Sequence, residues 1–89
     1  MIYLITYDLK EPGQNYKGLY DAIKNASDGT WMHYLDSTWI IRTNLGAKQV
    51  YERIKPCVDN SDNFLIVEIK ENYYGWLPNE AWDYFKKMF

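Results

Sequence analysis

The chain has 89 residues, enough for one small domain, and its formal net charge is −2. This charge argues against strong, sequence-independent binding of DNA or RNA, which depends on a broad positive surface. The single cysteine, Cys57, excludes an intramolecular disulfide, and no basic-then-apolar signal segment or membrane-length apolar run is present. We therefore expect a cytoplasmic protein without a membrane partner. Aromatic residues make up 18% of the chain, and most are Tyr or Trp, a composition that suits a subunit interface and favours a homodimer.

The first nine residues, Met1 to Leu9, predict a buried β-strand. The run is apolar, aromatic and β-branched, and it holds no Gly or Pro that would weaken the ladder of a sheet. Asp8 is its one carboxylate and stands where the strand should end. Two interpretations of Asp8 are open: a turn-forming side chain that accepts backbone N–H bonds, or a residue with a chemical role.

A helix is predicted over residues 16–26, after a turn at Pro12-Gly13 and with Asn15 as its N-cap. Its apolar residues recur at the spacing of one helix face, and they are Tyr16, Leu19, Tyr20 and Ile23. A loop at residues 27–29 should follow this helix.

Residues 31–43 predict a β-hairpin, because Trp, Tyr, Ile and Thr crowd two arms around the turn formers Asp36 and Ser37. With a turn at these two residues, Tyr34 should face Trp39 across the strands, as an aromatic cross-strand pair.

A second helix should begin after Asn44 or Gly46 and end near Pro56, since proline disfavours helical dihedrals in the residue before it. Its inward residues are expected to be Ala47, Val50, Ile54 and Val58. Residues 59–63 then predict a solvated loop, and residues 64–69 a further strand that is apolar on both faces.

The resulting order, β-α-β-β-α-β, predicts an α+β fold, a ferredoxin-like antiparallel sheet with two helices on one face. We assign residues 1–70 to this domain. Residues 71–89 add an aromatic arm and a short helix that starts at Pro78 and has Trp82, Phe85 and Phe89 on its apolar side, with Ala81 and Met88 adjoining. Because the strands are apolar on both faces, the second face needs a cover. The tail docked on its own domain and a partner subunit are the two candidates.

Several segments make the chain resemble known families. A β-α-β-β-α-β chain with Tyr7-Asp8-Leu9 closing the first strand resembles the small CRISPR-associated protein Cas2 and the related VapD-type ribonucleases. Ser37-Thr38-Trp39 lies where Cas2 proteins carry a Ser-Val-Phe-like triplet. Asp8-Leu9, the stretch from His33 to Ile41, and Gly75-Trp76-Leu77-Pro78 look like a bacterial family often labelled "SinR family protein", although the sequence shows no helix-turn-helix.

The resemblance implies a homodimer in which two copies of Asp8 approach each other across the two-fold axis and bind Mg²⁺. A hard cation of this kind needs oxygen ligands and can activate a water or stabilise a leaving phosphate oxygen. Cas2 proteins usually place Arg or Lys soon after the Asp, whereas this chain has Lys10 and Lys17 with Glu11 between them. The implied activity is a metal-dependent endoribonuclease that uses Asp8 from both subunits.

Three further residues are secondary candidates, each with a structural alternative. His33 is a candidate general acid or base, or a packed side chain of a strand. Ser37 is a candidate nucleophile, or simply a turn residue. Arg42 is a candidate phosphate contact, or part of a solvated surface.

Cys57 is most simply a small buried apolar residue. The four tryptophans have three possible roles: base stacking, core filling or dimer contact. They are Trp31, Trp39, Trp76 and Trp82.

Two functions of different class follow from these patterns. The first is the Mg²⁺-dependent nuclease, acting on RNA, that the resemblance implies. The second is a non-enzymatic dimeric interaction or regulatory module, whose acidic, aromatic surface contacts a protein partner. The motifs favour the first function, and the net negative charge favours the second.

Overall fold

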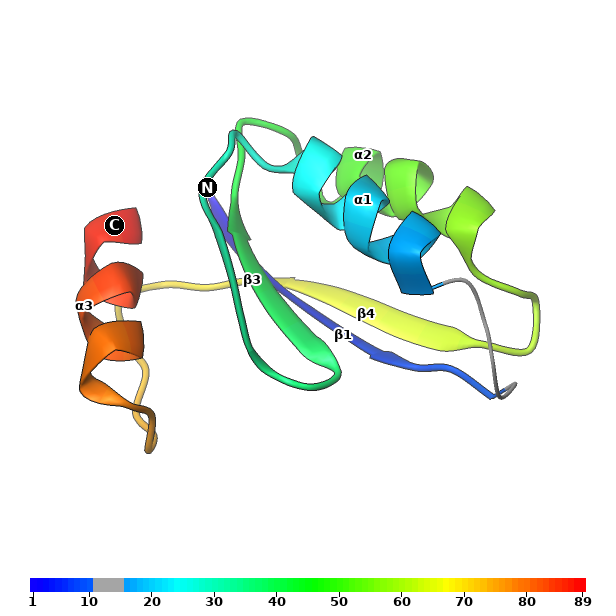
Figure 1. Cartoon of the computed structure of the whole chain (residues 1–89). Coiled ribbons are helices and arrows are strands. Elements are labelled where there is room, and N and C mark those ends of the chain that lie inside the picture. Colours follow the sequence, from blue (N-terminus) through cyan, green and yellow to red (C-terminus); the bar gives the residue numbers. More distant parts are fainter. Residues whose placement is uncertain (11–15) are drawn as a thin grey trace.

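Figure 1 shows the computed structural model, which describes residues 1–10 and 16–89. The predicted turn at Pro12-Gly13 and the Asn15 cap lie outside these residues. In the described parts of the chain, strands and helices follow one another in the order expected from the sequence. Their bounds are β1 Ile2–Asp8, α1 Tyr16–Ala26, β2 Trp31–Leu35, β3 Thr38–Arg42, α2 Ala47–Ile54, a 3-10 turn η1 at Lys55–Cys57, β4 Asn63–Glu68 and α3 Asn79–Met88.

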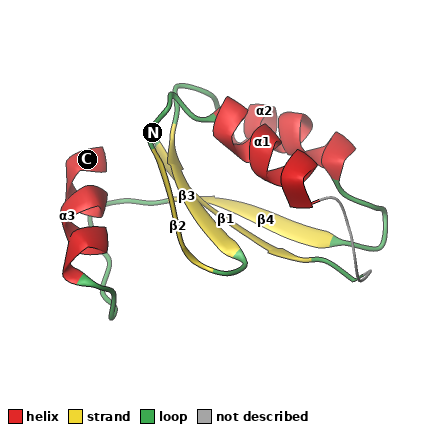
Figure 2. Ribbon diagram, viewed as in Figure 1, coloured by secondary structure: helices red, strands yellow, loops and turns green. Residues whose placement is uncertain are grey.

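The four described strands form one antiparallel sheet in the order β2-β3-β1-β4 (Figure 2). Strand β1 is an inner strand, with Ile5 opposite Trp39 of β3 on one side and Ile66 of β4 on the other. This inner position agrees with the unbroken apolar run that predicted it. The predicted α+β class with an antiparallel sheet is confirmed, and the strand order is consistent with a ferredoxin-like arrangement.

Helices α1 and α2 lie side by side on one face of the sheet (Figure 1). Side chains alternate in direction along a strand, so Tyr3, Ile5 and Tyr7 of β1 point toward these helices. Most of the predicted inward residues face this core, but Tyr16 at the start of α1 and Ala47 at the start of α2 are exposed, so the prediction is wrong for these two. The main core consists of Tyr3, Ile5, Tyr7, Leu19, Ile23, Ala26, Trp39, Ile41, Val50 and Ile54.

Helix α3 packs at one end of the opposite face of the sheet (Figures 1 and 2). A second, smaller core joins it to strands β1 and β2, and its buried members are Ile2, Met32, Ala81, Phe85 and Met88. The backbone N–H of Trp31 also donates to the Tyr84 hydroxyl, over 3.3 Å. The predicted helix is confirmed, and Phe85 is buried together with the adjoining Ala81 and Met88, whereas Phe89 follows the helix and is 40% exposed.

The end of α2 differs from the sequence-based expectation. The α-helix stops at Ile54, and Pro56 continues the chain in the 3-10 turn. This change of winding turns Cys57 to the surface, so the prediction of a buried cysteine is wrong, and Val58 packs against the main core instead. Within residues 1–10 and 16–89, no helix has both the length and the apolar character needed to cross a membrane.

Candidate functional site at the end of strand β1

Asp8 is the last residue of β1 and lies at an exposed end of the sheet. Because Tyr7 points toward the helices, Asp8 falls on the other face, together with Leu4 and Thr6. Its side chain is 68% exposed, and its Oδ2 lies 2.6 Å from Nζ of Lys10. A shallow hollow of about 240 Å³ surrounds it, lined by Thr6, Tyr7, Asp8, Asn63, Phe64 and Leu65. The site thus combines an accessible carboxylate with one neighbouring cation.

A turn-forming carboxylate is present near the end of β1, but it belongs to Asp62. Its Oδ1 accepts the backbone N–H of Lys10 and its Oδ2 accepts the backbone N–H of Asp59, each over 2.9 Å. Asp62 is only 9% exposed. The sequence analysis placed it in a solvated loop and missed this role. The signal was there, since an Asp three residues after the start of a loop is typical of side-chain to backbone bonding.

Ser37 lies at the same end of the sheet as Asp8. The predicted two-residue turn is confirmed, and the Ser37 carbonyl oxygen accepts the backbone N–H of Tyr7 over 3.2 Å. The hydroxyl of Thr6 donates to the same oxygen over 3.3 Å. These bonds attach the hairpin turn to the end of β1, and they use the backbone of Ser37.

The Tyr7 hydroxyl fixes the hairpin from inside the core. It donates to the carbonyl oxygen of Asp36 and accepts the indole N–H of Trp39, each over 3.3 Å. Burial raises the pKa of this hydroxyl well above its usual value of 10, so it stays protonated and keeps donating at neutral pH. The geometry of the end of β1 is therefore held by buried groups directly beneath it.

His33 is packed against aromatic rings. It stacks on Trp39 with ring centroids 4.1 Å apart and an interplanar angle of 16°, and it meets the ring of Tyr20 nearly edge-on at 5.1 Å. Its Nε2 lies 2.9 Å from the carbonyl oxygen of Asp36, so this nitrogen carries the proton and donates. The pairing of β2 with β3 is irregular at this point, and it places His33, not the predicted Tyr34, against Trp39.

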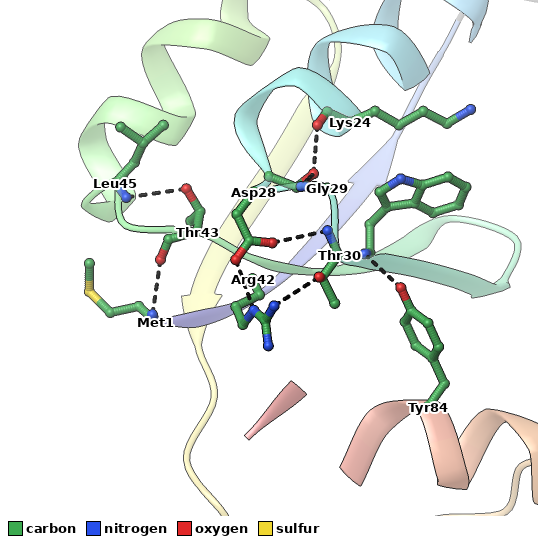
Figure 3. A network of polar contacts seen from close by, with 11 residues as sticks. Met1, Lys24, Asp28, Gly29, Thr30, Arg42, Thr43, Leu45 and Tyr84 are labelled. Atoms are coloured by element: carbon green, nitrogen blue, oxygen red, sulfur yellow. Dashed lines mark hydrogen bonds and ion pairs between the residues drawn. The ribbon is translucent and has the colours of Figure 1, made fainter. Parts of the chain in front are cut away.

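Arg42 lies at the far end of the sheet from Asp8. In the β1–β3 pairing it stands opposite Ile2, six residues along the strand from Asp8, which corresponds to about 20 Å. Its Nε donates to Oδ2 of Asp28 over 2.8 Å, and its terminal nitrogen Nη2 donates to the Thr30 hydroxyl over 3.0 Å (Figure 3). Within one chain, Asp8 and Arg42 therefore cannot act on the same atom.

Asp28 and Arg42 form a clamp on the loop between α1 and β2. Gly29 reverses this loop with a φ of 100°, a conformation that favours glycine, and Asp28 Oδ1 accepts the Thr30 N–H over 3.0 Å (Figure 3). Partial burial acts to raise the pKa of the Asp28 carboxyl. Hydrogen bonds from Arg42 and Thr30, with the Arg42 charge, outweigh this effect and hold the pKa below its ordinary value. Arg42 thus has a structural role that the sequence analysis did not identify.

No protein-family model and no curated protein sequence matches this chain. Statements about its function therefore rest on its own residues. Within the described residues, no three His, Cys, Asp or Glu side chains come together in a group that could hold a metal ion.

Beyond α3, the second face of the sheet is apolar and open. The β1–β4 pairing puts Leu65 and Val67 on this face beside Thr6 and Leu4, and the two β4 side chains are 59% and 46% exposed. A groove of about 280 Å³ separates the sheet from the segment that leads into α3. Its lining residues are Leu4, Leu35, Ile40, Ile69, Tyr73, Tyr74, Gly75, Trp76, Leu77, Trp82 and Phe85. Asp8 lies on the same face as this apolar surface.

Proposed function

We propose that the chain is a small cytoplasmic homodimer of the Cas2-like and VapD-like ferredoxin-like class, and a metal-dependent endoribonuclease that uses Asp8 from both subunits. The observation that carries this proposal is the position of Asp8. Its accessible carboxylate stands on the face of the sheet that α1 and α2 leave uncovered, at the end away from α3. A second subunit on this apolar face would bring a second Asp8 into the same region. The strand order β2-β3-β1-β4, with β1 and β3 inside, supports the ferredoxin-like assignment.

The donor groups around Asp8 fit Mg²⁺ in kind, because this ion prefers oxygen ligands and retains several waters. The hollow is lined by Asp8, Thr6 and Asn63, whose side chains carry oxygen atoms, although the Thr6 hydroxyl already donates to the Ser37 carbonyl oxygen. One chain offers a single exposed carboxylate in this hollow, so the Asp8 of a second subunit is needed to complete the set of metal ligands. When bound, the ion would stabilise charge on a phosphate oxygen and lower the pKa of a bound water.

Lys10 has a defined part in this proposal. Its ammonium group neutralises Asp8 through Oδ2 at 2.6 Å, and a cation held by both carboxylate oxygens would displace it. Both side chains are largely exposed, so their ion pair contributes little to stability and the exchange is easy. Once released, Lys10 stands next to the site with a positive charge that suits an RNA phosphate.

The non-enzymatic module remains the second candidate, and two observations favour it. The Asp8 carboxylate already has a cationic partner, and the surface beside it is apolar rather than basic. A dimer built on this face would then present an acidic, aromatic surface to another protein. Cleavage assays discriminate directly between the two functions.

The test compares the native protein with Asp8→Asn on single-stranded RNA and double-stranded DNA, with Mg²⁺ and with EDTA. Asp21→Asn is a matched control, because Asp21 is also an exposed carboxylate in an ion pair with a lysine, at 2.8 Å on α1. The nuclease proposal expects Mg²⁺-dependent RNA cleavage that Asp8→Asn lowers at least about 100-fold, since even groups that only orient metal ligands contribute about 10–100-fold. Asp21→Asn should cleave normally. Absent cleavage would leave the interaction module as the function, and equal cleavage by Asp8→Asn would refute the role of Asp8.

A further inference from the structure

We propose that Tyr74 and Trp76 are the anchors by which a second copy of this chain docks on the open face of the sheet. The arm, residues 70–78, would insert these side chains against the apolar face of the other subunit, and the reverse contact would form by symmetry. This inference rests on the homodimer in the proposed function and assigns the surface that makes it.

The first observation is the way in which the arm presents its side chains. Tyr73 and Leu77 face inward to the small core around α3, with the ring centroid of Tyr73 4.4 Å from that of Phe85. Tyr74 and Trp76 point outward and are as exposed as in an extended chain, at 103% and 97%. The inward residues therefore hold the arm in place, so little conformational entropy remains to be lost when the outward residues bind.

The second observation is that a projection and a hollow lie on the same face. The groove beside the arm has a volume of about 280 Å³, and a liquid water molecule takes about 30 Å³, so it has room for a large side chain. Its sheet side is aliphatic, with Leu4, Leu35 and Ile40. A two-fold dimer needs a surface that complements itself. A projecting Trp76 next to an apolar groove meets that requirement, because each subunit can give one and receive the other.

The third observation is the area available. A large aromatic side chain buries about 150–250 Å², so the two anchors from two subunits supply roughly 600–1,000 Å². The half-exposed aliphatic side chains of the same face, Leu35, Leu65 and Val67, add to this total in both subunits. The sum reaches the range of about 1,200–2,000 Å² that stable protein interfaces bury.

The charges near the arm favour a second copy over RNA as the occupant. Base-stacking tryptophans normally lie in a positively charged groove. Here Lys70 is paired with Glu68 at 2.9 Å, Glu71 lies within the arm, Glu80 follows it, and Lys86 lines the hollow beside Tyr74. An apolar, nearly neutral face suits a protein surface of the same character.

The test is sedimentation of the native protein, Trp76→Ala and Tyr74→Ala at micromolar concentration, with circular dichroism to compare their folds. The matched control is Tyr16→Ala, an aromatic residue that is 43% exposed on α1, away from the open face. Trp76→Ala should weaken the dimer by about 30-fold or more, which corresponds to the 2 kcal/mol of an interface hot spot. Tyr16→Ala should dimerise like the native protein. Because Trp76 is fully exposed in the subunit, its removal leaves the monomer folded.

A second variant tests the receiving surface. Leu35→Lys places a charge in the groove, on the edge strand β2, at a position that is 56% exposed, so the subunit tolerates it, but the dimer should dissociate. A native protein that dimerises while Trp76→Ala and Leu35→Lys dimerise equally well would overturn this inference and leave the proposed homodimer intact on another surface. A native monomer would overturn both. Loss of RNA binding by Trp76→Ala without any change in sedimentation would identify Trp76 as a base-stacking residue and also refute the dimer anchor.

Discussion

Replacing Phe85 by alanine removes the side chain that joins helix α3 to the sheet. Phe85 is 4% exposed and packs in the small core with Ile2 and Met32, while its ring meets that of Tyr73 at 4.4 Å. Phe to Ala changes in protein cores cost about 3–5 kcal/mol. A groove borders this cluster, so the neighbours can partly close the space, and we expect a loss of about 3 kcal/mol.

This loss is large for the molecule. At roughly 0.05–0.15 kcal/mol per residue, a chain of 89 residues has about 4–13 kcal/mol of stability in total. Urea unfolding followed by circular dichroism measures the change. Phe89→Ala is the matched control, because Phe89 directly follows the same helix but is 40% exposed, and it should cost under about 1 kcal/mol. An equal effect of the two substitutions would show that α3 does not dock through Phe85.

Two other predictions concern the clamp and the tail. Asp28→Asn should lower the free energy of unfolding by about 1 kcal/mol at pH 7, because the ion pair with Arg42 is partly exposed and screened by solvent. The pKa of Asp28 is held below its usual 3.8, so this stabilisation is present at neutral pH and is lost as the pH falls through the lowered pKa. In urea titrations, the difference between the two proteins should therefore be smaller at pH 3 than at pH 7. An equal difference at both pH values would contradict the assignment. Deleting Trp76 to Phe89 uncovers Ile2, Met32 and Ile40, and size-exclusion chromatography should show dissociation or aggregation of the shortened chain. A soluble species of unaltered oligomeric state would mean that the tail covers nothing important.

Local patterns of apolar residues in the sequence predicted most of the fold. The unbroken apolar run of Met1 to Leu9 was enough to predict an inner strand, and the helical spacing from Tyr16 to Ile23 predicted α1 to within a residue of its end. Both signals come from local geometry that repeats along an element. Turn chemistry was equally informative at Asp36 and Ser37, because a two-residue hairpin turn restricts which residues can occupy it.

Long-range contacts were beyond the reach of such patterns. Arg42 meets Asp28 across 14 residues, and Lys10 meets Asp62 across 52, so no local spacing could have paired them. The irregular pairing of β2 with β3 shows another limit, since one displaced residue moved His33 to the place expected for Tyr34. For Asp8, the sequence predicted the residue and its strand end, while the ion pair with Lys10 emerged only with the three-dimensional structure.

The inner position of β1 has a consequence for how the chain folds during synthesis. Tyr3 pairs with Ile41 on one side and with Glu68 on the other, so β1 is made well before the strand β4 that completes its pairing. Ribosomes add about 5–20 residues per second, and the stretch from Ile2 to Glu68 takes about 3–13 s. During that time the most apolar segment of the nascent chain has no lasting β partner on one edge. Sheets closed by such distant pairings also fold slowly, so premature contacts of β1 with other chains compete with folding from the start.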